Sequence, residues 1–390
     1  MGRSKGDSRM RIVVVSDSMP PWNFGGKEER LRLFMQNHSS VKNAEIIYCT
    51  MRWWKDDKNL ANHHSLTKLH PMYTKKNRRS ISQALIFALG CFKVLRFRPD
   101  IIEADQIPIF PVFTLKIVAR LTGAKLSVTC HEYWSHKTWG EYLGNKWLGR
   151  LAHFIEKRGL GLADILVAVS DETAHLLRQN TKWREKVSLV PNEIDRHLID
   201  QAQTTLPSCD LLFVGRFIES KKIDTLLRAL ALVNKSGFNL KLALVGDGPD
   251  SAKLYALVKE LELETNVIFY GFLPNSSDVY GLMKKCKIFI SPSIREGFGF
   301  SVLEASHAGA RVIISGHSDN LTNRSLKDAS NITIVDQDTS EAYAEAIKRH
   351  LSRENVEASR KNLSSIPPYA NTYQANWDLM NELDLSLIHI

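Results

Sequence analysis

Two adjacent stretches, KIFISP at residues 287–292 and IREGFGFSVLEASHAGA at residues 294–310, decide the fold of the chain around them. The first is a short apolar run that is typical of a buried strand. The second begins with the flexible Gly-Phe-Gly and continues into an Ala-containing stretch that favours a helix. This order predicts a strand, a loop that carries Glu296, and a helix with Glu304 about one turn inside it.

A loop of this kind suits an anionic ligand that also carries hydroxyl groups. Glycine lets the backbone approach a ligand closely, and the free N–H groups at a helix start attract phosphate oxygens. Glu296 and Glu304 can accept hydrogen bonds from neutral hydroxyls, so a sugar, a diphosphate and a ribose could bind in one line. The alternative is structural: Glu296 caps the helix, and Glu304 is a solvated helix residue.

Length and composition indicate a globular protein of about two domains. The chain has 390 residues, of which 44% are apolar and 24% charged. The first ten residues, MGRSKGDSRM, are polar and do not resemble a secretory signal, so we expect a cytoplasmic protein. The five cysteines are scattered and form no CxxC, which indicates neither a disulfide framework nor a zinc site.

The positive charge of the chain belongs to its first half. Residues 1–200 contain 32 Lys and Arg against 20 Asp and Glu, a net +12, whereas residues 201–390 contain 20 against 22, a net −2. An anionic partner is therefore expected for the first half. Membrane headgroups or a lipid phosphate fit better than nucleic acid, which is not expected as a partner.

Strand and helix signals alternate along the chain, which predicts parallel sheets with helices on both faces. In the first half, strands are expected at residues 11–16, 45–50, 100–104, 125–130, 165–169 and 187–191. The pattern breaks at residues 202–208 and restarts with strands at 211–214, 240–245, 267–270, 287–291 and 311–314. We therefore expect an α/β protein with one Rossmann-like domain over 1–204, a second over 205–365, and a C-terminal helix over 366–390 that crosses back to the first.

Two features of the first half lie where an open parallel sheet binds ligands, beyond the carboxyl ends of its strands. Gly25 and Gly26 follow the first strand and precede a helix. They do not form a GxGxxG fingerprint, and a plain tight turn is the alternative. His131 follows the strand KLSVTC, where its ring can exchange hydrogen bonds with a substrate hydroxyl, although a structural role stays open.

Residues 75–97 combine a basic cluster with an apolar helical face. The cluster contains Lys75, Lys76, Arg78 and Arg79, and the face contains Ile81, Leu85, Ala88, Leu89, Phe92 and Leu95. A basic cluster beside an amphipathic helix is typical of proteins that bind a membrane surface. The alternative is that this helix packs on its own sheet.

Three strand ends in the second half favour nucleotide binding. Gly215-Arg216 closes the first strand, and Lys221 and Lys222 stand just before the next helix, where cations suit a diphosphate. The turn at residues 246–249, GDGP, closes the second strand. The third ends in residues that could stack against a base, namely Gly271, Phe272 and Leu273. Taken singly, each of these features could be a loop with solvated charges.

Together these residues resemble the retaining glycosyltransferases of the GT-B fold, specifically glycosyltransferase family four. The resemblance covers nearly the whole chain and is most specific in the second half. It consists of a Gly-Arg, a Lys five residues after the Arg, a GDGP turn and a Glu-x7-Glu motif, which appear in order as Gly215-Arg216, Lys221, residues 246–249 and Glu296 to Glu304. In the first half, Gly25-Gly26, His131 and the VPN at residues 190–192 also match.

The resemblance implies two Rossmann-like domains whose sheets face each other across a cleft, and it implies a role for each site residue. Arg216 and Lys221 would neutralise a donor diphosphate, and Glu304 would hold ribose hydroxyls. Glu296 and the backbone amides of the following loop would hold the transferred sugar; that loop comprises Gly297, Phe298 and Gly299. His131 would contact the sugar at the reacting centre, and Gly25 and Gly26 would approach the donor phosphates or the acceptor.

The chain departs from the family pattern at three places. Lys222 and Glu193 each replace a usual glycine, and residues 315–325 lack the usual Gly-Gly-x-x-Glu. None of these departures touches the residues to which the resemblance assigns a role.

The expected activity is transfer of a hexose-type sugar from a nucleoside-diphosphate sugar to a hydroxyl acceptor, with retention of configuration. The acceptor is expected to be lipid-linked or another glycan precursor. No metal or other cofactor is expected, because the cations and helix-start amides can stabilise the leaving diphosphate. Peripheral association with the inner face of the plasma membrane is an extension of this expectation. Two alternatives stay open: a nucleotide-sugar epimerase of the same fold and a non-catalytic membrane-surface binder.

Overall fold

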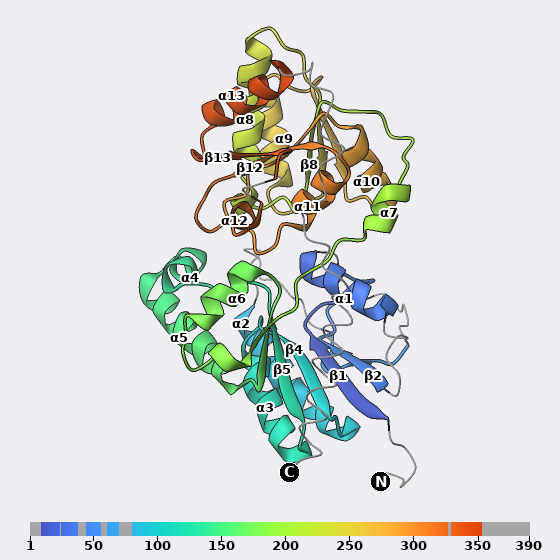
Figure 1. Ribbon diagram of the computed structural model, residues 1–390, viewed down its shortest axis with the longest axis vertical. Helices are drawn as coiled ribbons and strands as arrows, with labels where there is room; N and C mark the ends of the chain where they lie inside the picture. Colours follow the sequence, from blue (N-terminus) through green and yellow to red (C-terminus); the bar gives the residue numbers. More distant parts are fainter. Residues whose placement is uncertain are drawn as a thin grey trace. The chain divides into compact units, whose positions relative to one another are not determined.

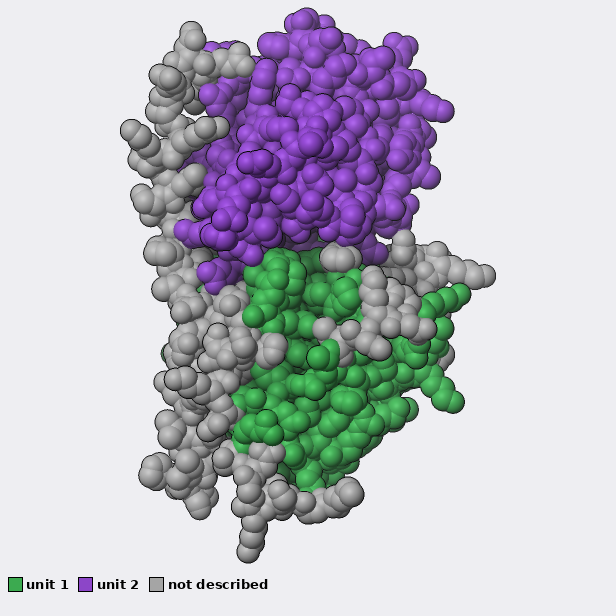
Figure 2. Space-filling view, turned by 90° about the vertical axis from the view of Figure 1, so that its right-hand side faces the viewer, with its two compact units in different colours: residues 1–192, 369–390 green, residues 193–368 purple. Residues whose placement is uncertain are grey.

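The computed structural model describes residues 9–23, 25–37, 44–55, 61–69, 80–326 and 329–352, with the backbone alone for residues 324 and 325. These residues form two compact units that divide between Asn192 and Glu193 (Figure 2). The helix expected over residues 366–390 lies outside the described part of the chain.

The boundary between the units precedes the expected one at residue 204, because helix α7 (Arg196–Gln201) belongs to unit 2. The Lys284 ammonium donates to the backbone carbonyls of Asp200 and Ala202 at 2.5 and 3.1 Å. His307 Nε2 also lies 3.0 Å from Asp200 Oδ1. These contacts hold the segment around α7 against helices of the second sheet.

Unit 1 is built on a seven-stranded parallel sheet in the order β3-β2-β1-β4-β5-β6-β7 (Figure 1). Its strands are β1 (Met10–Ser16), β2 (Ala44–Thr50), β3 (His63–Ser65), β4 (Ile101–Asp105), β5 (Lys125–Cys130), β6 (Ile165–Ala168) and β7 (Val187–Leu189). Its helices are α1 (Gly26–Asn37), α2 (Ile81–Gly90), η2 (Cys91–Phe97), α3 (Phe110–Thr122), α4 (His136–Leu143), α5 (Lys146–Leu162), α6 (Asp171–Arg178) and η3 (Arg184–Lys186). The predicted strands are present, and β3 is an additional edge strand.

The strands of unit 1 bury side chains on both faces, as expected for a parallel sheet. Successive residues point to opposite faces. Val13 and Val15 of β1 pack in the cluster that contains α2, α3 and α6 residues, whereas Ile12 and Val14 pack with Phe34 of α1. The unbroken apolar run of β1 therefore fits a strand that lies inside the sheet and is buried on both faces.

Unit 2 is built on a six-stranded parallel sheet in the order β10-β9-β8-β11-β12-β13. Its strands are β8 (Leu211–Val214), β9 (Leu242–Val245), β10 (Val267–Gly271), β11 (Ile288–Ser291), β12 (Arg311–Ser315) and β13 (Ile332–Val335). Besides α7, its helices are η4 (Glu219–Lys221), α8 (Ile223–Lys235), α9 (Ser251–Glu260), α10 (Ser276–Lys285), α11 (Phe300–His307), α12 (Thr322–Ser325) and α13 (Ser340–Ser352). One apolar cluster joins α8, α9 and α13 to one face, and another joins α7, α10 and α11 to the other (Figure 1).

Helix ends follow local capping chemistry. Ser170 caps α6 by accepting a hydrogen bond from the Thr173 N–H at 3.1 Å, and Asn145 caps α5 by accepting from Trp147 and Leu148. Among the helices that the structure describes, none combines the length and apolarity needed to cross a bilayer. All five cysteines are buried free thiols, as expected for small core residues.

Glu156 on α5 is a buried acid within unit 1. Its side chain is 0% exposed, and its carboxylate accepts hydrogen bonds from Gln106 Nε2 and, at 2.8 Å, from Trp139 Nε1. Burial raises the pKa of this carboxyl from 4.5 to about 7, although the two hydrogen bonds act in the opposite direction. The folded state binds this proton more tightly than the unfolded state does, so protonation of Glu156 stabilises the fold. That contribution is fully present below the unfolded pKa and is lost as the pH rises through about 7.

Substitution Glu156→Gln should remove this pH dependence. Glutamine has the same shape and stays neutral, and the Gln106 amide can flip to accept a hydrogen bond from it. Between about pH 5 and about pH 8, the free energy of unfolding in urea should shift in favour of the variant by about 1–3 kcal/mol relative to the wild type. Glu141→Gln, which changes an exposed acid of α4, is the control. If the free energies of unfolding of Glu156→Gln and the wild type differed by the same amount over this pH range, the raised pKa of Glu156 would be contradicted.

Lys222 adopts a left-handed backbone conformation between η4 and α8, with φ 50° and ψ 38°. An L side chain in this region costs about 1–2 kcal/mol, which glycine avoids. This is one of the positions where the resembled family usually carries glycine. The chain therefore adopts at Lys222 a backbone conformation that glycine would favour.

The backbone strain at Lys222 should be visible in a pair of variants. Both Lys222→Gly and Lys222→Ala delete the charged side chain, but only glycine relieves the left-handed strain. We expect Lys222→Gly to be more stable than Lys222→Ala by about 1 kcal/mol in urea denaturation of the full chain. The reverse order would show that this backbone conformation is not strained.

Candidate functional site

The two sheets each contain a point where the direction of strand order reverses. In unit 2 this point lies between β8 and β11, and in unit 1 it lies between β1 and β4. In open parallel sheets, ligands bind outside the carboxyl ends of the strands at such a point. The site residues predicted from sequence are therefore expected at these two edges.

At the edge of unit 2, Lys221 and Glu296 contact each other. Lys221 ends η4 after β8, and Glu296 lies in the loop after β11; the Lys221 ammonium donates to Glu296 Oε1. Their side chains are 18% and 14% exposed. The Ile294 N–H donates to the Ser220 carbonyl at 3.0 Å, so the backbone also joins the two loops. Residues 75 positions apart thus form one ion pair at the reversal point.

The backbone around Glu296 is held by the segment after β12. Glu296 forms an isolated parallel bridge with Asn320, and the Leu321 N–H donates to the Glu296 carbonyl at 2.9 Å. The buried Asn320 amide donates to the carbonyls of Ser293 and Ser315 at 3.0 and 3.3 Å. Sequence reasoning assigned no role to Asn320, because only the fold places it beside the β11 loop.

A loop of Gly297, Phe298 and Gly299 joins Glu296 to helix α11, which begins at Phe300. Gly299 occupies the N-cap position with φ 74°, and no side chain caps the helix. The alternative that Glu296 caps this helix is therefore wrong. A Cβ at Gly299 would lie 2.5 Å from Thr322 Oγ1, which is too close to tolerate a side chain. Within the described part of the chain, this buried hydroxyl has no hydrogen-bond partner.

Glu304 lies in the second turn of α11 and is 9% exposed. Its Oε1 accepts a hydrogen bond from the Tyr280 hydroxyl of α10 at 3.0 Å. The alternative of a solvated helix residue is therefore wrong as well. Tyr280, which the sequence reasoning missed, belongs to an apolar helix face and gives no separate signal.

The other predicted residues of unit 2 lie on neighbouring loops of the same edge. Arg216 is exposed directly after β8, and Phe272 is 50% exposed after β10, with Gly271 and Leu273 on either side. The Gly246 N–H donates to the Gly271 carbonyl at 2.8 Å, and a Cβ at Gly246 would lie 2.0 Å from the Gly215 carbonyl oxygen. The GDGP turn therefore needs its first glycine in order to pack against the Gly-Arg loop.

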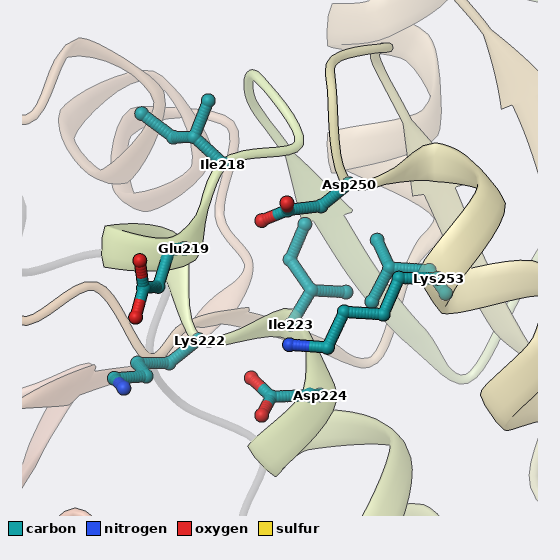
Figure 3. A pocket seen from close by; sticks show the side chains of 8 residues that line it. Ile218, Glu219, Lys222, Ile223, Asp224, Asp250 and Lys253 are labelled. Atoms are coloured by element: carbon teal, nitrogen blue, oxygen red, sulfur yellow. The ribbon is translucent and has the colours of Figure 1, made fainter. Parts of the chain in front are cut away.

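A small pocket with mixed charges lies beside this edge, at the starts of α8 and α9 (Figure 3). Its walls carry three carboxylates, from Glu219, Asp224 and Asp250, and two ammonium groups, from Lys222 and Lys253. Neither Lys221 nor Glu296 lines it. Lys221 and Lys222, although adjacent in the sequence, therefore have different surroundings.

At the edge of unit 1, the side chains of Lys27 at the start of α1, Asp105 at the end of β4 and His131 after β5 meet. His131 Nε2 lies 3.1 Å from Asp105 Oδ1, and the Lys27 ammonium lies 3.2 Å from Asp105 Oδ2. Lys27 also donates to Asp17 in the loop after β1. The prediction that His131 lies at this edge is confirmed by its place after β5.

The charges around Asp105 keep its carboxyl group ionised. Burial raises the pKa of the Asp105 carboxyl, but the Lys27 ammonium and His131 outweigh burial, and the pKa lies well below its ordinary value. An ionised carboxylate can only accept a hydrogen bond, so His131 Nε2 carries the hydrogen and Nδ1 remains for other contacts. The walls of a small pocket include Lys27, Asp105 and His131 together with Arg30, Glu103 and Thr129.

Gly25 and Gly26 lie at the start of α1, on the loop that also carries Asp17. Both are exposed, and a Cβ on Gly25 would meet Glu28 Oε2 at 2.7 Å. Glu28 accepts hydrogen bonds from Ser18 and Asn23 of the same loop at 2.5 and 2.9 Å. Sequence reasoning missed Lys27 and Asp105. Asp105 lies at the carboxyl end of a strand, which is the same signal that identified His131.

The sequence matches two family models, one in each half of the chain. Residues 65–193 match the glycosyl transferase 4-like domain, and residues 200–365 match the glycosyl transferases group 1. Together these ranges cover residues 65–192 of unit 1 and most of unit 2.

Individual relatives and solved structures agree with the models. The chain is 26% identical to the N-acetylgalactosamine-N,N'-diacetylbacillosaminyl-diphospho-undecaprenol 4-alpha-N-acetylgalactosaminyltransferase of Campylobacter jejuni, over 64% of this chain and 67% of that one. Three sequence relatives are matched over only 54% to 67% of their own length.

Among solved structures, sucrose-phosphate synthase from Thermosynechococcus elongatus has a TM-score of 0.72 at 18% identity, covering 98% of this chain and 100% of that one. Anabaena HepE in complex with UDP has a TM-score of 0.62 at 17% identity, covering 97% and 99%. These likenesses establish the fold of both units. Because the two family models together match more than half of the chain, the chain belongs to the GT-B glycosyltransferases of the family-four type.

Proposed function

We propose that the chain transfers a hexose-type sugar from a nucleoside-diphosphate sugar to a hydroxyl group, with retention of configuration and without a metal. The observation that carries this proposal is the Lys221–Glu296 ion pair at the reversal point of unit 2, next to the glycine-rich start of α11. It combines a cation for phosphate, free backbone amides and a carboxylate for sugar hydroxyls within one loop pair.

Each residue of this edge receives a role that matches its surroundings. Arg216 and Lys221 offset the charge of the diphosphate, and the Lys221 ammonium has hydrogens enough to serve both Glu296 and a phosphate. Glu296 and the loop of Gly297, Phe298 and Gly299 hold the transferred sugar. Glu304 holds the ribose hydroxyls, and the base packs near Gly271, Phe272 and Leu273. HepE was solved with UDP, so uracil is the first base to test.

For unit 1 we propose that His131 contacts the transferred sugar and that Gly25 and Gly26 approach the phosphates or the acceptor. Asp105 and Lys27 are positioning residues, because they act through the His131 ring. The Campylobacter relative is named for a diphospho-undecaprenol substrate, which supports a lipid-linked acceptor as the first class to test.

In the proposed step, the acceptor oxygen attacks the anomeric carbon from the face on which the diphosphate departs. The new carbon–oxygen bond forms as the bond to the diphosphate breaks, and a diphosphate oxygen takes the acceptor proton. Arg216, Lys221 and the α11 amides stabilise the charge that develops on the leaving group.

The direct test is a thermal-shift screen with a panel of nucleotide sugars, followed by product analysis with and without a lipid-linked acceptor. A true donor should raise the melting temperature. Transfer should persist in a chelator such as EDTA, and the product should keep the donor's anomeric configuration. Isomerised sugar formed from the donor alone would identify an epimerase instead. The absence of any shift across the panel would contradict donor binding.

The cations at the unit 2 edge should act on the diphosphate specifically. Arg216→Ala and Lys221→Met should each lower kcat/KM by about 10²–10³-fold, because each removes positive charge from the leaving group. Calorimetry should show weaker UDP binding but unchanged, weak uridine binding. Lys259→Met near the opposite end of α9 is the control for loss of one positive charge. Wild-type rates in both site variants would contradict the assignment.

The positioning role of Asp105 can be measured by a double-mutant cycle with His131. Asp105→Asn should lower kcat by about 10–100-fold, because an amide no longer requires His131 Nε2 to carry the hydrogen. His131→Ala should cost at least as much, and the double variant should be no worse than His131→Ala alone. The UDP thermal shift should be retained in all three. Additive losses would show that Asp105 acts independently of His131.

A further inference from the structure

Helix α2 and the η2 turn that follows it present an apolar stripe to solvent. The packing side of this segment consists of Phe87, Ala88, Cys91 and Val94, which join the sheet core. The opposite side carries four side chains that are 40–69% exposed, namely Ile81, Leu85, Leu89 and Phe92. Of the face predicted from sequence, Ala88 is buried, Leu95 is partly buried and these four are exposed. The helix therefore packs on its own sheet, as the alternative expected, but it leaves most of the predicted face exposed to solvent. The basic cluster at residues 75–79 lies outside the described residues.

The apolar stripe continues over two neighbouring helices. Helix α3 packs against both α2 and α5 on the same side of the sheet (Figure 1). Ile117 and Leu121 of α3 are 47% and 68% exposed, one helical turn apart. Helix α5 adds Trp147 at 75%, with further exposed side chains at helical spacing, namely Leu148, Leu151 and Phe154. Of the twelve large apolar side chains that are exposed in the described part of unit 1, eleven lie on these segments; the twelfth is Leu69.

The charges on these segments are almost entirely positive. Helices α2, η2, α3 and α5 carry eight basic residues: Lys93, Arg96, Lys116, Arg120, Lys146, Arg150, Lys157 and Arg158. Seven of these are exposed, the exception being the partly buried Lys116. Glu156 is their one acid, and it is 0% exposed. These four segments therefore present cations and apolar groups without an exposed carboxylate of their own.

Arginines on α5 lie directly over its exposed aromatic rings. The Arg150 guanidinium lies 4.8 Å from the Trp147 ring centre, and that of Arg158 lies 5.0 Å from the Phe154 ring centre. Each pair places a cation and an aromatic ring at one point of the surface. Amphipathic helices that lie in a lipid interface combine these groups in the same way, with Trp, Phe and Leu toward the acyl chains and Lys and Arg toward the headgroups.

We propose that the outer face of α2, η2, α3 and α5, here called the apolar–basic surface, docks onto the headgroup region of an anionic lipid bilayer. Its apolar side chains lose water on docking, and its cations are attracted to the negative surface potential. A second copy of the chain is a poorer occupant, because it would bring seven exposed cations against another seven. This inference goes beyond the proposed function, since docking requires neither a nucleotide sugar nor transfer.

Co-sedimentation of the full chain with lipid vesicles tests the proposal. The protein should bind vesicles of phosphatidylcholine with phosphatidylglycerol, bind pure phosphatidylcholine far more weakly, and lose binding as salt is added. The triple variant Leu89→Gln, Trp147→Gln and Phe154→Gln should bind the anionic vesicles at least about tenfold more weakly. The double variant Arg150→Glu and Arg158→Glu should also lose binding.

A matched control changes exposed apolar residues of unit 2. Tyr255→Gln with Leu232→Gln removes side chains that are 50% and 37% exposed and should leave vesicle binding unchanged. Circular dichroism and thermal melting establish that each variant is folded. Equal binding by the control and the triple variant, or no binding of wild type to anionic vesicles, would overturn the proposal. A dimer in sedimentation velocity that the triple variant dissolves would assign the surface to a second copy instead.

Discussion

The structure depends on one constraint: neighbouring parallel strands whose connections depart in opposite directions leave their carboxyl ends uncovered. In unit 2 this occurs between β8 and β11, and the loops after these strands are joined by the Lys221–Glu296 ion pair and by the hydrogen bond from Ile294 to Ser220. In unit 1 it occurs between β1 and β4, where Lys27 meets Asp105. The same topology therefore assembles a charged group at the edge of each sheet.

The two edges differ in how their charges are balanced. At the unit 2 edge a single lysine faces a single glutamate, and both belong to loops that contain glycine or a helix start. At the unit 1 edge Lys27 lies between two aspartates, and the carboxylate it shares with His131 holds the orientation of the ring. The first arrangement can bind a second anion beside Glu296, since the Lys221 ammonium keeps hydrogens to donate. The second arrangement fixes the His131 ring through Asp105, which Lys27 holds in turn.

Much of this was predictable from sequence, because central parallel strands are unbroken apolar runs and the residues after them are easily identified. The strands at the centres of both sheets and the place of His131 followed from that pattern. Edge strand β3, with the sequence HHS, has no such run and was missed. The contact of Asp105 with His131 depends on the pairing of β4 with β5, and periodicity cannot reveal it. Periodicity also grouped Ile81, Leu85, Leu89 and Phe92 on one face without showing which of two apolar faces meets the sheet.

The five native cysteines leave the chain suited to site-specific labelling. All five thiols are buried, and burial raises the pKa of each of them. Thiolates react with maleimides far faster than thiols do, so the native cysteines should be silent toward such reagents. A cysteine introduced at one exposed position would then be the sole attachment point for a spin label or fluorophore, without prior removal of the native five. Distances between the two units in solution could be measured with pairs of such labels.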